Sequence, residues 1–591
     1  MTNAHAVSAS PEERSHRLSE VRARMRDLAL DGYVVRGTDR YLNEYVPTDQ
    51  SQRAWLSGFT GSIADLFITA HKAFIYVDGR YYLQADKETD PALFSVVKVP
   101  FGQGNEQVMY GTLVAQAAEG VRRVGFEPDR FSVSELASLR RAVEAGGVEL
   151  VPVAPSLVER VRGPVAVKPG KVRAVDVAIT GTSVDTKLHT IRTAMTEHKL
   201  DALVVTALDD IAYLSNLRGS EIDFQATFKG VAVVTSGDFV VALSDFARRR
   251  ELPQVSSPRF VDEAAWTQVL QGARRVGFDE GSATEAVRQA IAGTGAEAVA
   301  VHSPIKPMKA NKNEAELAHL VDAYRRADKV IWAVQGWLHR RVDNGEKTTE
   351  ADLAHEVERR FKRSGGTGLS FEVIAAQGAN GAIIHYSDPD ATKPIAPGTI
   401  VLLDTGTYYE GGYATDLTRT FVAGKKNVAP GERQKMLFTL VLKGAIAGMQ
   451  VRFPEGTKGF QLDAMCRRPL WQNGLQYLHG TGHGVGINVH EMPPRVAAVG
   501  SMALEPGQVF SIEPGIYLEG EIGIRIENLV TVVKDPEVPG FLRVVPITFS
   551  PLDKRLIDTK LLTREEKAFV KWFEAQWKKP AQGLPELPPL A

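Results

Sequence analysis

The sequence predicts an α/β protein in which two copies of one domain precede a third region of different character. Three observations support this. Helix-like and strand-like segments alternate over the first half of the chain, which is typical of α/β domains. The order of those segments then occurs a second time. From Phe371 onward the pattern changes to short strands separated by glycine turns. Because 591 residues exceed what one hydrophobic core accommodates, several domains are expected.

The first copy opens with a well-marked helix. Ser10 can cap it, Pro11 fits the first helical position, and Glu13 completes a capping-box pattern. Apolar residues at helical spacing follow as far as Leu28. Strands are then expected at 32–35, 66–69 and 74–77, and the chain later reads Arg-Arg-Val-Gly-Phe-Glu at 122–127. We assign residues 11–165 to this first domain.

The second copy presents the same elements in the same order. A helix is expected at 186–198, with strands at 201–205, 231–234 and 239–242. Segment 212–220 is similar to 54–62, and segment 274–279 is similar to 122–127. These two similarities are offset by 158 and 152 residues. Chance could produce one of them, but two in the same order indicate a duplicated domain, and we assign 175–308 to the second copy.

The third region begins after a linker rich in proline and lysine, at 303–312. Asn313 and Glu316 form a capping-box pattern for a long helix that reaches about Val342. A second helix is expected at 349–363. We assign residues 312–591, including a C-terminal extension, to this domain.

The composition is that of a globular protein with balanced charge. The chain has 70 basic and 71 acidic residues, a net charge of -1, which argues against nucleic acid or an anionic membrane as partner. Its one cysteine, Cys466, excludes an intramolecular disulfide and favours a reducing compartment. Residues 1–10 lack the apolar stretch of a signal peptide, and no apolar run is long enough to cross a bilayer. We therefore expect a soluble, cytoplasmic protein.

Five potential metal ligands lie in the last third of the chain, each in a short stretch of strand or turn near glycine. They are Asp404, Asp416, His483, Glu513 and Glu527. Carboxylates with an imidazole suit a pair of hard or borderline divalent cations, and two bridged cations can activate water against an acyl bond. Two simpler interpretations stay open: the aspartates could be ordinary turn residues, and Arg525 could be the ion partner of a buried glutamate.

Histidines accompany these ligands. His479 and His483 lie in a stretch with glycine at alternate positions, which lets backbone approach a site closely. His490 follows seven residues after His483. This pattern favours a functional site over ordinary buried histidines. His385 is expected at the end of an apolar strand, where a simple buried histidine is an equal alternative.

At these residues the chain resembles the pita-bread metallopeptidases, in which five ligands follow in the order Asp, Asp, His, Glu, Glu. The stretches 477–486, 489–491, 383–386, 511–515 and 525–528 resemble the Xaa-Pro aminopeptidases of that family. The doubled domain resembles their long, three-domain cytosolic form. The resemblance implies two creatinase-like α/β domains followed by a pita-bread catalytic domain. Met492-Pro493 departs from the usual Gly-Pro, and the loop before His490 is about two residues shorter than in the family.

The resemblance also implies roles for the residues. Asp404 would chelate one metal and His483 the other, while Asp416, Glu513 and Glu527 hold the pair. Glu513 would act as general base. His385 and His490 would contact substrate and stabilise the oxyanion, with His483 also lining the substrate site, and His479 would shuttle protons or orient the others. Arg525 would hold the Glu527 region and touch substrate, and Arg80 would reach the cleft.

The expected cofactor is two divalent ions, manganese first, with zinc or cobalt as alternatives. The expected reaction releases the N-terminal residue of a peptide whose second residue is proline, and the expected assembly is a homodimer. Two other functions stay open. A prolidase, which is restricted to dipeptides, has the same metal site. A pita-bread domain can also serve as a non-catalytic binding module.

Overall fold

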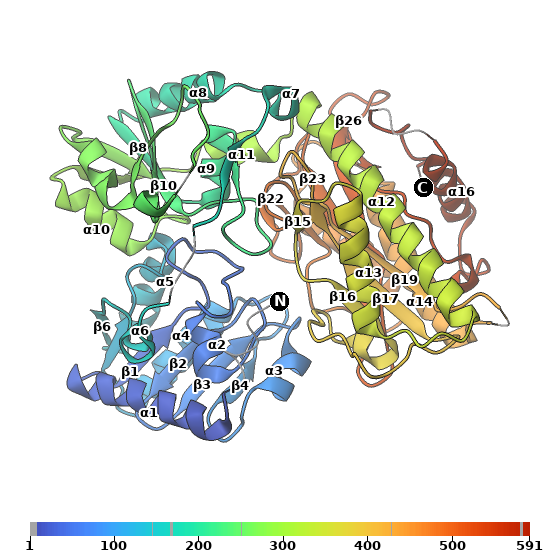
Figure 1. Ribbon diagram of the computed structural model, residues 1–591, viewed down its shortest axis with the longest axis horizontal. Helices are drawn as coiled ribbons and strands as arrows, with labels where there is room; N and C mark the ends of the chain where they lie inside the picture. The colour runs from blue at the N-terminus through green and yellow to red at the C-terminus, as the bar shows by residue number, and fades with distance from the viewer. Residues whose placement is uncertain are drawn as a thin grey trace. The chain divides into compact units, whose positions relative to one another are not determined.

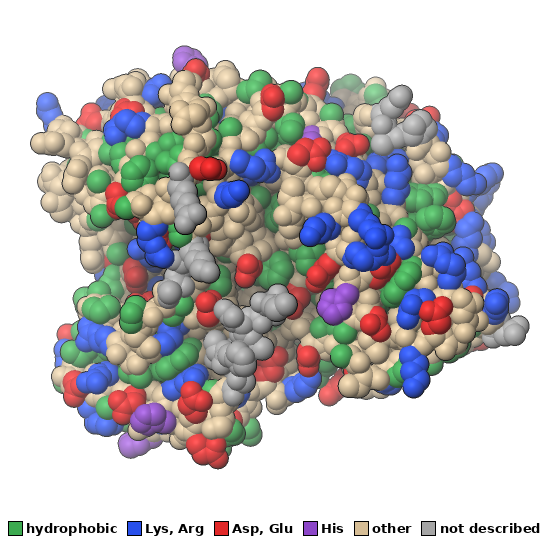
Figure 2. Space-filling view, in the orientation of Figure 1, with side chains coloured by type: hydrophobic (Ala, Val, Ile, Leu, Met, Phe, Trp, Pro, Cys, Tyr) green, Lys and Arg blue, Asp and Glu red, His purple; other side chains and the backbone are tan. Residues whose placement is uncertain are grey.

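The computed structural model describes residues 9–144, 146–165, 169–249, 251–426, 428–579 and 583–590 (Figure 1). The chain forms two compact units. The first comprises residues up to 305, apart from two short segments, 175–183 and 224–226, which belong with residues 306–591 in the second. Among the described residues, no helix combines the length and apolar character needed to span a membrane. On the face shown in Figure 2, acidic and basic side chains are interspersed.

The first sheet of unit 1 has six strands in the order β4-β3-β2-β1-β5-β6. Its strands are β1 (Gly32–Val35), β2 (Asp65–Thr69), β3 (Ala73–Val77), β4 (Ser95–Lys98), β5 (Arg123–Phe126) and β6 (Glu149–Pro152). Helix α1 (Pro11–Asp27) contributes to the hydrophobic core on one face, and α4 (Asn105–Ala118) and α5 (Val133–Glu144) contribute to the core on the other. The predicted cap is confirmed, because the Ser10 hydroxyl accepts a hydrogen bond from the Glu13 amide.

The second sheet repeats the first strand for strand, in the order β12-β11-β10-β8-β13-β14. Its strands are β8 (Ala202–Val205), β10 (Gly230–Thr235), β11 (Phe239–Leu243), β12 (Arg259–Asp262), β13 (Arg275–Phe278) and β14 (Glu297–Ala300). Helix α8 (Val184–Glu197) precedes the first of them and α10 (Glu285–Gly293) precedes the last. In each sheet the first strand pairs antiparallel with the second and parallel with the fifth. The duplication expected from the sequence is therefore present.

The two copies contact each other through equivalent segments. The Val133 amide donates to the Ala283 carbonyl, and the Glu285 amide donates to the Phe131 carbonyl, both at 3.0 Å. The two donors, Val133 and Glu285, are 152 residues apart, and so are the two acceptors, Phe131 and Ala283. This spacing equals one of the two offsets found in the sequence. The contact is therefore self-complementary, like the isologous interface of a symmetric dimer, although it lies within one chain.

Unit 2 contains the sheets that carry the predicted ligands. One sheet has the order β16-β17-β19, and a six-stranded sheet has the order β20-β27-β26-β23-β21-β22. The strands are β15 (Gly368–Leu369), β16 (Ile374–Gln377), β17 (Ile400–Thr405), β18 (Thr407–Tyr408), β19 (Leu417–Val422), β20 (Arg452–Pro454), β21 (Gly482–Gly484), β22 (Glu491–Val496), β23 (Val509–Ile512), β24 (Gly515–Leu518), β25 (Ile522–Arg525), β26 (Asn528–Lys534) and β27 (Phe541–Pro546). The pairs β15/β18 and β24/β25 form small separate sheets.

Helices pack against both larger sheets of unit 2. Helices α12 (Glu314–Asp343) and α13 (Glu350–Arg363) share a hydrophobic core with β17 and β19. Helices α14 (Glu432–Met449), α15 (Gly459–Trp471) and α16 (Arg564–Trp577) share the core of the six-stranded sheet. The long α12 is prominent in Figure 1. Both sheets are thereby backed by apolar packing, which holds their strand ends in fixed positions.

The predicted starts of α12 and α13 are confirmed. Asn313 and Glu316 form both hydrogen bonds of the capping box, and Thr349 caps α13. The segment predicted as a linker, 303–312, is more ordered than expected. It contains the short helix α11 (Ile305–Ala310), and Lys312 is buried against Glu491 at 2.6 Å. The predicted domain boundaries at 165/175 and 308/312 stay a prediction.

Candidate metal centre

Strand ends from two sheets bring the five predicted ligands together. The antiparallel pairing of β17 with β19 places Asp404 opposite Thr418, and Asp416 immediately precedes β19. From the larger sheet, β21 carries His483, and Glu513 directly follows β23. Glu527 lies between β25 and β26. Because these side chains lie at strand ends, the apolar faces of the sheets can be buried while the carboxylates gather in one centre.

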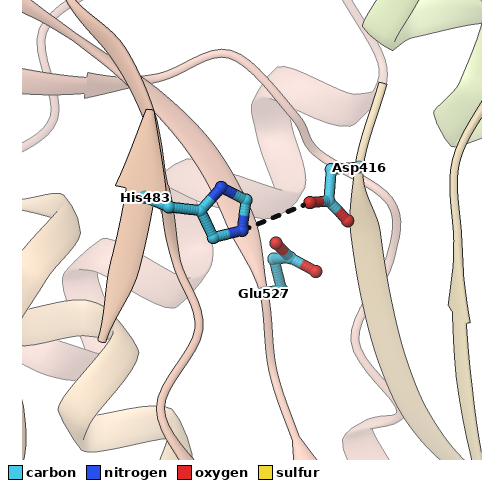
Figure 3. Close-up of side chains that lie close together, drawn as sticks. All are labelled: Asp416, His483 and Glu527. Carbon is cyan, nitrogen blue, oxygen red and sulfur yellow. Dashed lines mark ion pairs between the residues drawn. The ribbon is translucent and has the colours of Figure 1, made fainter. Parts of the chain in front are cut away.

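The ligand atoms lie within a few ångströms of one another. The His483 Nε2 atom is 3.6 Å from Asp416 Oδ2 and 3.4 Å from Glu513 Oε1. Asp416, His483 and Glu527 each present one atom to a group in which all separations are within 4.8 Å (Figure 3). The His483 Nδ1 atom is 3.1 Å from the Gly484 carbonyl, to which it donates in the tautomer that leaves Nε2 free as a ligand.

Burial and mutual repulsion make these carboxylates resist ionisation. Burial raises the pKa of Asp416 well above its ordinary value, and the charges of Glu527, Asp404 and Glu513 raise it further. The pKa of Glu527 is also raised well above its ordinary value, by burial first and then by Asp404 and Glu513. Burial raises the pKa of Glu513 to about 7, although Arg525 opposes the rise. Such a cluster is stable in ionised form only with a compensating positive charge.

Two buried oxygen atoms indicate where that charge belongs. Asp404 Oδ1 and Glu527 Oε1 have no hydrogen-bond partner within the described part of the chain. The other oxygen of each group is satisfied: Arg525 donates to Asp404 Oδ2 at 2.6 Å and Thr418 to Glu527 Oε2 at 2.9 Å. A buried carboxylate oxygen left unpaired is costly, so divalent cations fit these positions. Oxygen donors with one imidazole suit hard or borderline ions.

Arg525 orients Asp404 and the groups around it. Its guanidinium, which is buried, donates to Thr418 Oγ1 at 3.0 Å and to the Tyr517 hydroxyl at 2.8 Å, in addition to Asp404. The prediction that Arg525 holds the Glu527 region stays a prediction. The ion pair is with Asp404, and the connection to Glu527 passes through the Thr418 hydroxyl. The pairing of β17 with β19 places Thr418 opposite Asp404, so these two partners of the guanidinium are neighbours.

His479 connects to this network through Tyr517. The His479 Nε2 atom is 2.9 Å from the Tyr517 hydroxyl, and Nδ1 is 2.7 Å from the Gly480 carbonyl. The Tyr517 oxygen can therefore donate to His479 while it accepts from Arg525. A hydrogen-bonded chain thus runs from His479 to Asp404. This contact supports an orienting role for His479; its predicted catalytic role stays a prediction.

The other two histidines and Arg80 lie as follows. The His490 ring packs edge-on against His483, with ring centroids 4.4 Å apart. The expectation that His385 ends a strand is wrong: it lies in a turn after the 3-10 helix η4 (Gly378–Ala382). Arg80 belongs to unit 1, where it donates to Asp78 at 2.7 Å. Its predicted reach into the cleft stays a prediction.

Three supporting residues were not predicted: Thr418, Ser511 and Tyr517. Ser511 accepts from the His483 amide and donates to Glu513 Oε1, both at 3.1 Å. One signal was available for two of them. Thr418 lies two positions after Asp416, and Ser511 lies two positions before Glu513, and residues at this spacing share one face of a strand. The contact of Tyr517 with Arg525 depends on the pairing of β24 with β25.

Comparison with known proteins gives a consistent result along the chain. The sequence model of metallopeptidase family M24 matches residues 318–534. Models of the creatinase/prolidase N-terminal domain match residues 17–163 and 164–316. A probable Xaa-Pro aminopeptidase P from Talaromyces stipitatus is 34% identical, over 96% of this chain and 89% of the relative. Another from Fusarium vanettenii is 34% identical over 96% of both chains.

Solved structures extend the likeness to three dimensions. The X-prolyl aminopeptidase of Caenorhabditis elegans, described as a cytosolic enzyme with a di-nuclear active site, superposes with a TM-score of 0.87. It is 27% identical, and the match covers 95% of each chain. The Xaa-Pro dipeptidase of Bacillus anthracis, 25% identical with a TM-score of 0.52, is covered over 99% of its length but covers only 63% of this chain.

Proposed function

Because the chain belongs to metallopeptidase family M24, with the Xaa-Pro aminopeptidase P enzymes among its relatives, we propose that it removes the N-terminal residue from peptides with proline in the second position. It is an aminopeptidase and a hydrolase. The observation that carries this function is a buried carboxylate centre, two of whose oxygens lack partners within the described ranges of the chain, together with 34% identity to such enzymes along nearly the whole chain.

Two divalent metal ions are the cofactor implied by the family and by the donor set. Asp404, Asp416, His483, Glu513 and Glu527 would hold them. When bound, the pair supplies positive charge that lowers the pKa of a water molecule and polarises the scissile carbonyl. We propose manganese as the ion, because a centre of four carboxylates and one imidazole favours harder ions than a structural zinc site does. Zinc and cobalt are the alternatives that the same donors accept.

The protein's own groups then have distinct tasks. Glu513 takes the proton of the attacking water and delivers it to the departing proline nitrogen, because a carboxylate within the centre can both accept and release that proton. His385 and His490 would donate hydrogen bonds to the oxygen of the tetrahedral intermediate. His483 would line the substrate site, and Arg525 keeps Asp404 oriented. Arg80 is proposed to contact the substrate from unit 1.

A dipeptidase is the main alternative function. The solved dipeptidase is matched over nearly its whole length, yet it covers only 63% of this chain. The aminopeptidase from C. elegans covers 95%. Whole-length likeness therefore favours the aminopeptidase. A non-catalytic binding module is disfavoured by the ligand set, since such a module has no need of unpartnered buried carboxylate oxygens.

We further propose a homodimer located in the cytoplasm. The location is supported by the C. elegans relative, which is described as cytosolic, and by the single cysteine, Cys466, which is buried. The dimer is an expectation from the family. Analytical ultracentrifugation of the metal-loaded protein would decide it: a single species of about one chain's mass would contradict the dimer.

The function is tested with Gly-Pro and Arg-Pro-Pro as paired substrates, after dialysis and reloading with manganese, zinc or cobalt. Release of arginine from the tripeptide is the expected result. Cleavage of Gly-Pro with refusal of Arg-Pro-Pro would assign a dipeptidase instead. Absence of both bound metal and hydrolysis after reloading would assign a binding module. Elemental analysis of each reloaded sample gives the metal content beside the rate.

A further inference from the structure

A second buried carboxylate in unit 2 lies outside the metal centre. Glu350, the first residue of α13, is fully buried. Its Oε1 accepts from the Gln377 amide at 2.6 Å, and its Oε2 accepts from the Tyr386 hydroxyl and the Asp390 amide, each at 2.8 Å. The Asn380 side-chain amide donates to both oxygens, at 3.0 and 3.2 Å. The carboxylate is thus satisfied by four donor groups.

All four donors belong to one segment, 377–390, which contains η4 and His385. Gln377 ends β16, and Asp390 lies at the far end of the segment. Their main-chain amides bond to the two oxygens of the same carboxylate, so Glu350 closes the segment into a loop. Tyr386, the neighbour of His385 in the chain, donates to the same group. A single acid therefore fixes both ends and the middle of the loop that carries His385.

The opposite side of the loop rests on β25. The Arg525 guanidinium approaches the Ile384 carbonyl at 3.4 Å. Backbone packs directly on backbone nearby: a Cβ placed on Gly523 would lie 1.6 Å from the Gly381 carbonyl oxygen, so only glycine fits. The loop is held between Glu350 on one side and the strand that supplies Arg525 on the other. Arg525 in turn holds Asp404.

Glu350 has no other evident task. The cap of α13 is Thr349, so the helix does not need Glu350 for that purpose. Both of its oxygens are occupied by protein donors, which leaves no lone pair directed at a metal ion. Its negative charge is stabilised by charge-assisted hydrogen bonds and by the N-terminal end of α13. These hydrogen bonds fix the position of segment 377–390.

We propose that Glu350 is a positioning residue for His385: by anchoring loop 377–390 it holds the imidazole in place for the peptidase reaction. This inference rests on the proposed function. It predicts that loss of the carboxylate acts on the reaction only through His385. A displacement of about 1 Å at a group that contacts the transition state can cost about 100-fold in rate.

The test is Glu350→Gln in a double-mutant cycle with His385→Ala. Glutamine keeps the size of the side chain but replaces one acceptor oxygen by a donor, which faces other donors in this pocket. With Arg-Pro-Pro as substrate, we expect kcat/KM to fall about 10- to 100-fold in the wild-type background. In the His385→Ala background the same change should cost less than about threefold. Metal content should be unchanged.

The matched control is Glu356→Gln on the same helix. The hydrogen bonds described for the Glu356 carboxylate go to Arg359 and Arg360. Activity should stay within about twofold of wild type. Hydrogen exchange gives a readout that does not depend on catalysis: peptides spanning 377–390 should exchange faster in Glu350→Gln than in the control. If Glu350→Gln does not fold, Tyr386→Phe removes one donor only and should shift both readouts in the same direction.

Equal losses from Glu350→Gln in both backgrounds would overturn the proposal, because the acid would then act independently of His385. Unchanged exchange of segment 377–390 would overturn it as well. If the wild-type protein cleaves neither peptide, the proposed function fails, and hydrogen exchange alone decides whether Glu350 anchors the loop. The two failures are therefore distinguishable.

Discussion

The metal centre and the Glu350 anchor both bury carboxylates in unit 2, yet they differ in how the oxygens are satisfied. In the anchor, both oxygens of Glu350 accept hydrogen bonds from protein donors. In the centre, Asp404 and Glu527 each keep one buried oxygen without such a partner among the residues that the structure describes. Burial alone therefore does not mark a metal site. A buried carboxylate with an unpartnered oxygen is suited to bind a cation, whereas one whose oxygens are all hydrogen-bonded serves to fix the backbone.

Removal of the metal ions tests this difference most strongly. Dialysis against a chelator should abolish peptide cleavage, and manganese should restore it. The reloaded protein should also resist unfolding better, by about 2.7 kcal/mol at a free metal concentration one hundred times Kd. Segment 377–390 should keep its slow hydrogen exchange throughout, because its anchor needs no ion. Full activity in protein shown by elemental analysis to be metal-free would break the comparison.

Glu513→Gln should give the next largest effect. The amide cannot take up a proton, so kcat for Arg-Pro-Pro should fall about 10²- to 10⁴-fold. Circular dichroism and the thermal midpoint should remain close to wild type. Glu356→Gln serves as a second amide substitution, away from the centre. A variant that keeps more than a tenth of the wild-type kcat would remove Glu513 from its proposed role.

The unfolding free energy of the metal-free protein should fall as the pH rises from 5 to 7, and bound metal should remove that fall. In the metal-free protein the pKa of Glu513 is raised from 4.5 to about 7, so the folded state holds a proton that the unfolded chain releases. Stability from this group is present below pH 4.5 and is lost as the pH rises towards 7, by about 1.4 kcal/mol per pH unit for each proton. The raised pKa values of Asp416 and Glu527 act in the same direction.

Bound metal should remove this decline, because the ligands bind in their deprotonated form. Urea unfolding at pH 5, 6 and 7, with chelator and with manganese, measures both curves. Stability of the chelator-treated protein that rises between pH 5 and 7 would contradict the assignment of buried, mutually repelling carboxylates to this centre.

The smallest effect is expected from Tyr517→Phe. The change removes the hydroxyl that connects His479 with Arg525, while Arg525 keeps its ion pair with Asp404. We expect a loss of about 1 kcal/mol in unfolding free energy and a decrease in kcat of less than about tenfold. Chemical denaturation and steady-state kinetics provide the two values. A loss as large as that of Glu513→Gln would assign Tyr517 to the chemistry itself.

Much of the fold was predictable because its signals are local. The caps at Ser10 and Asn313 are encoded within four residues, and the structure has helices starting there. The duplicated domain was predictable because similar segments follow in the same order. The candidate ligands could be named because each carboxylate follows or precedes a short apolar strand, so each can be recognised without knowledge of its partners.

Contacts between segments that lie far apart in the chain could not be predicted in the same way. Ile383 and Ile384 indicate a strand ending at His385, but these residues form a bend and a turn after η4, where Gly381 packs closely on Gly523. The ion pair of Arg525 with Asp404 joins residues that lie 121 positions apart in the chain. The register of strands that come from different parts of the chain sets these distances, and no local pattern specifies it.

The reciprocal hydrogen bonds between Val133 and Ala283 and between Glu285 and Phe131 have a consequence for unit 1. Two separate chains that meet through such a surface must give up translational and rotational freedom, and they separate on dilution. Here the tether makes the encounter intramolecular, with an effective concentration set by the connecting residues. The pairing of the two copies should therefore be independent of how much protein is present.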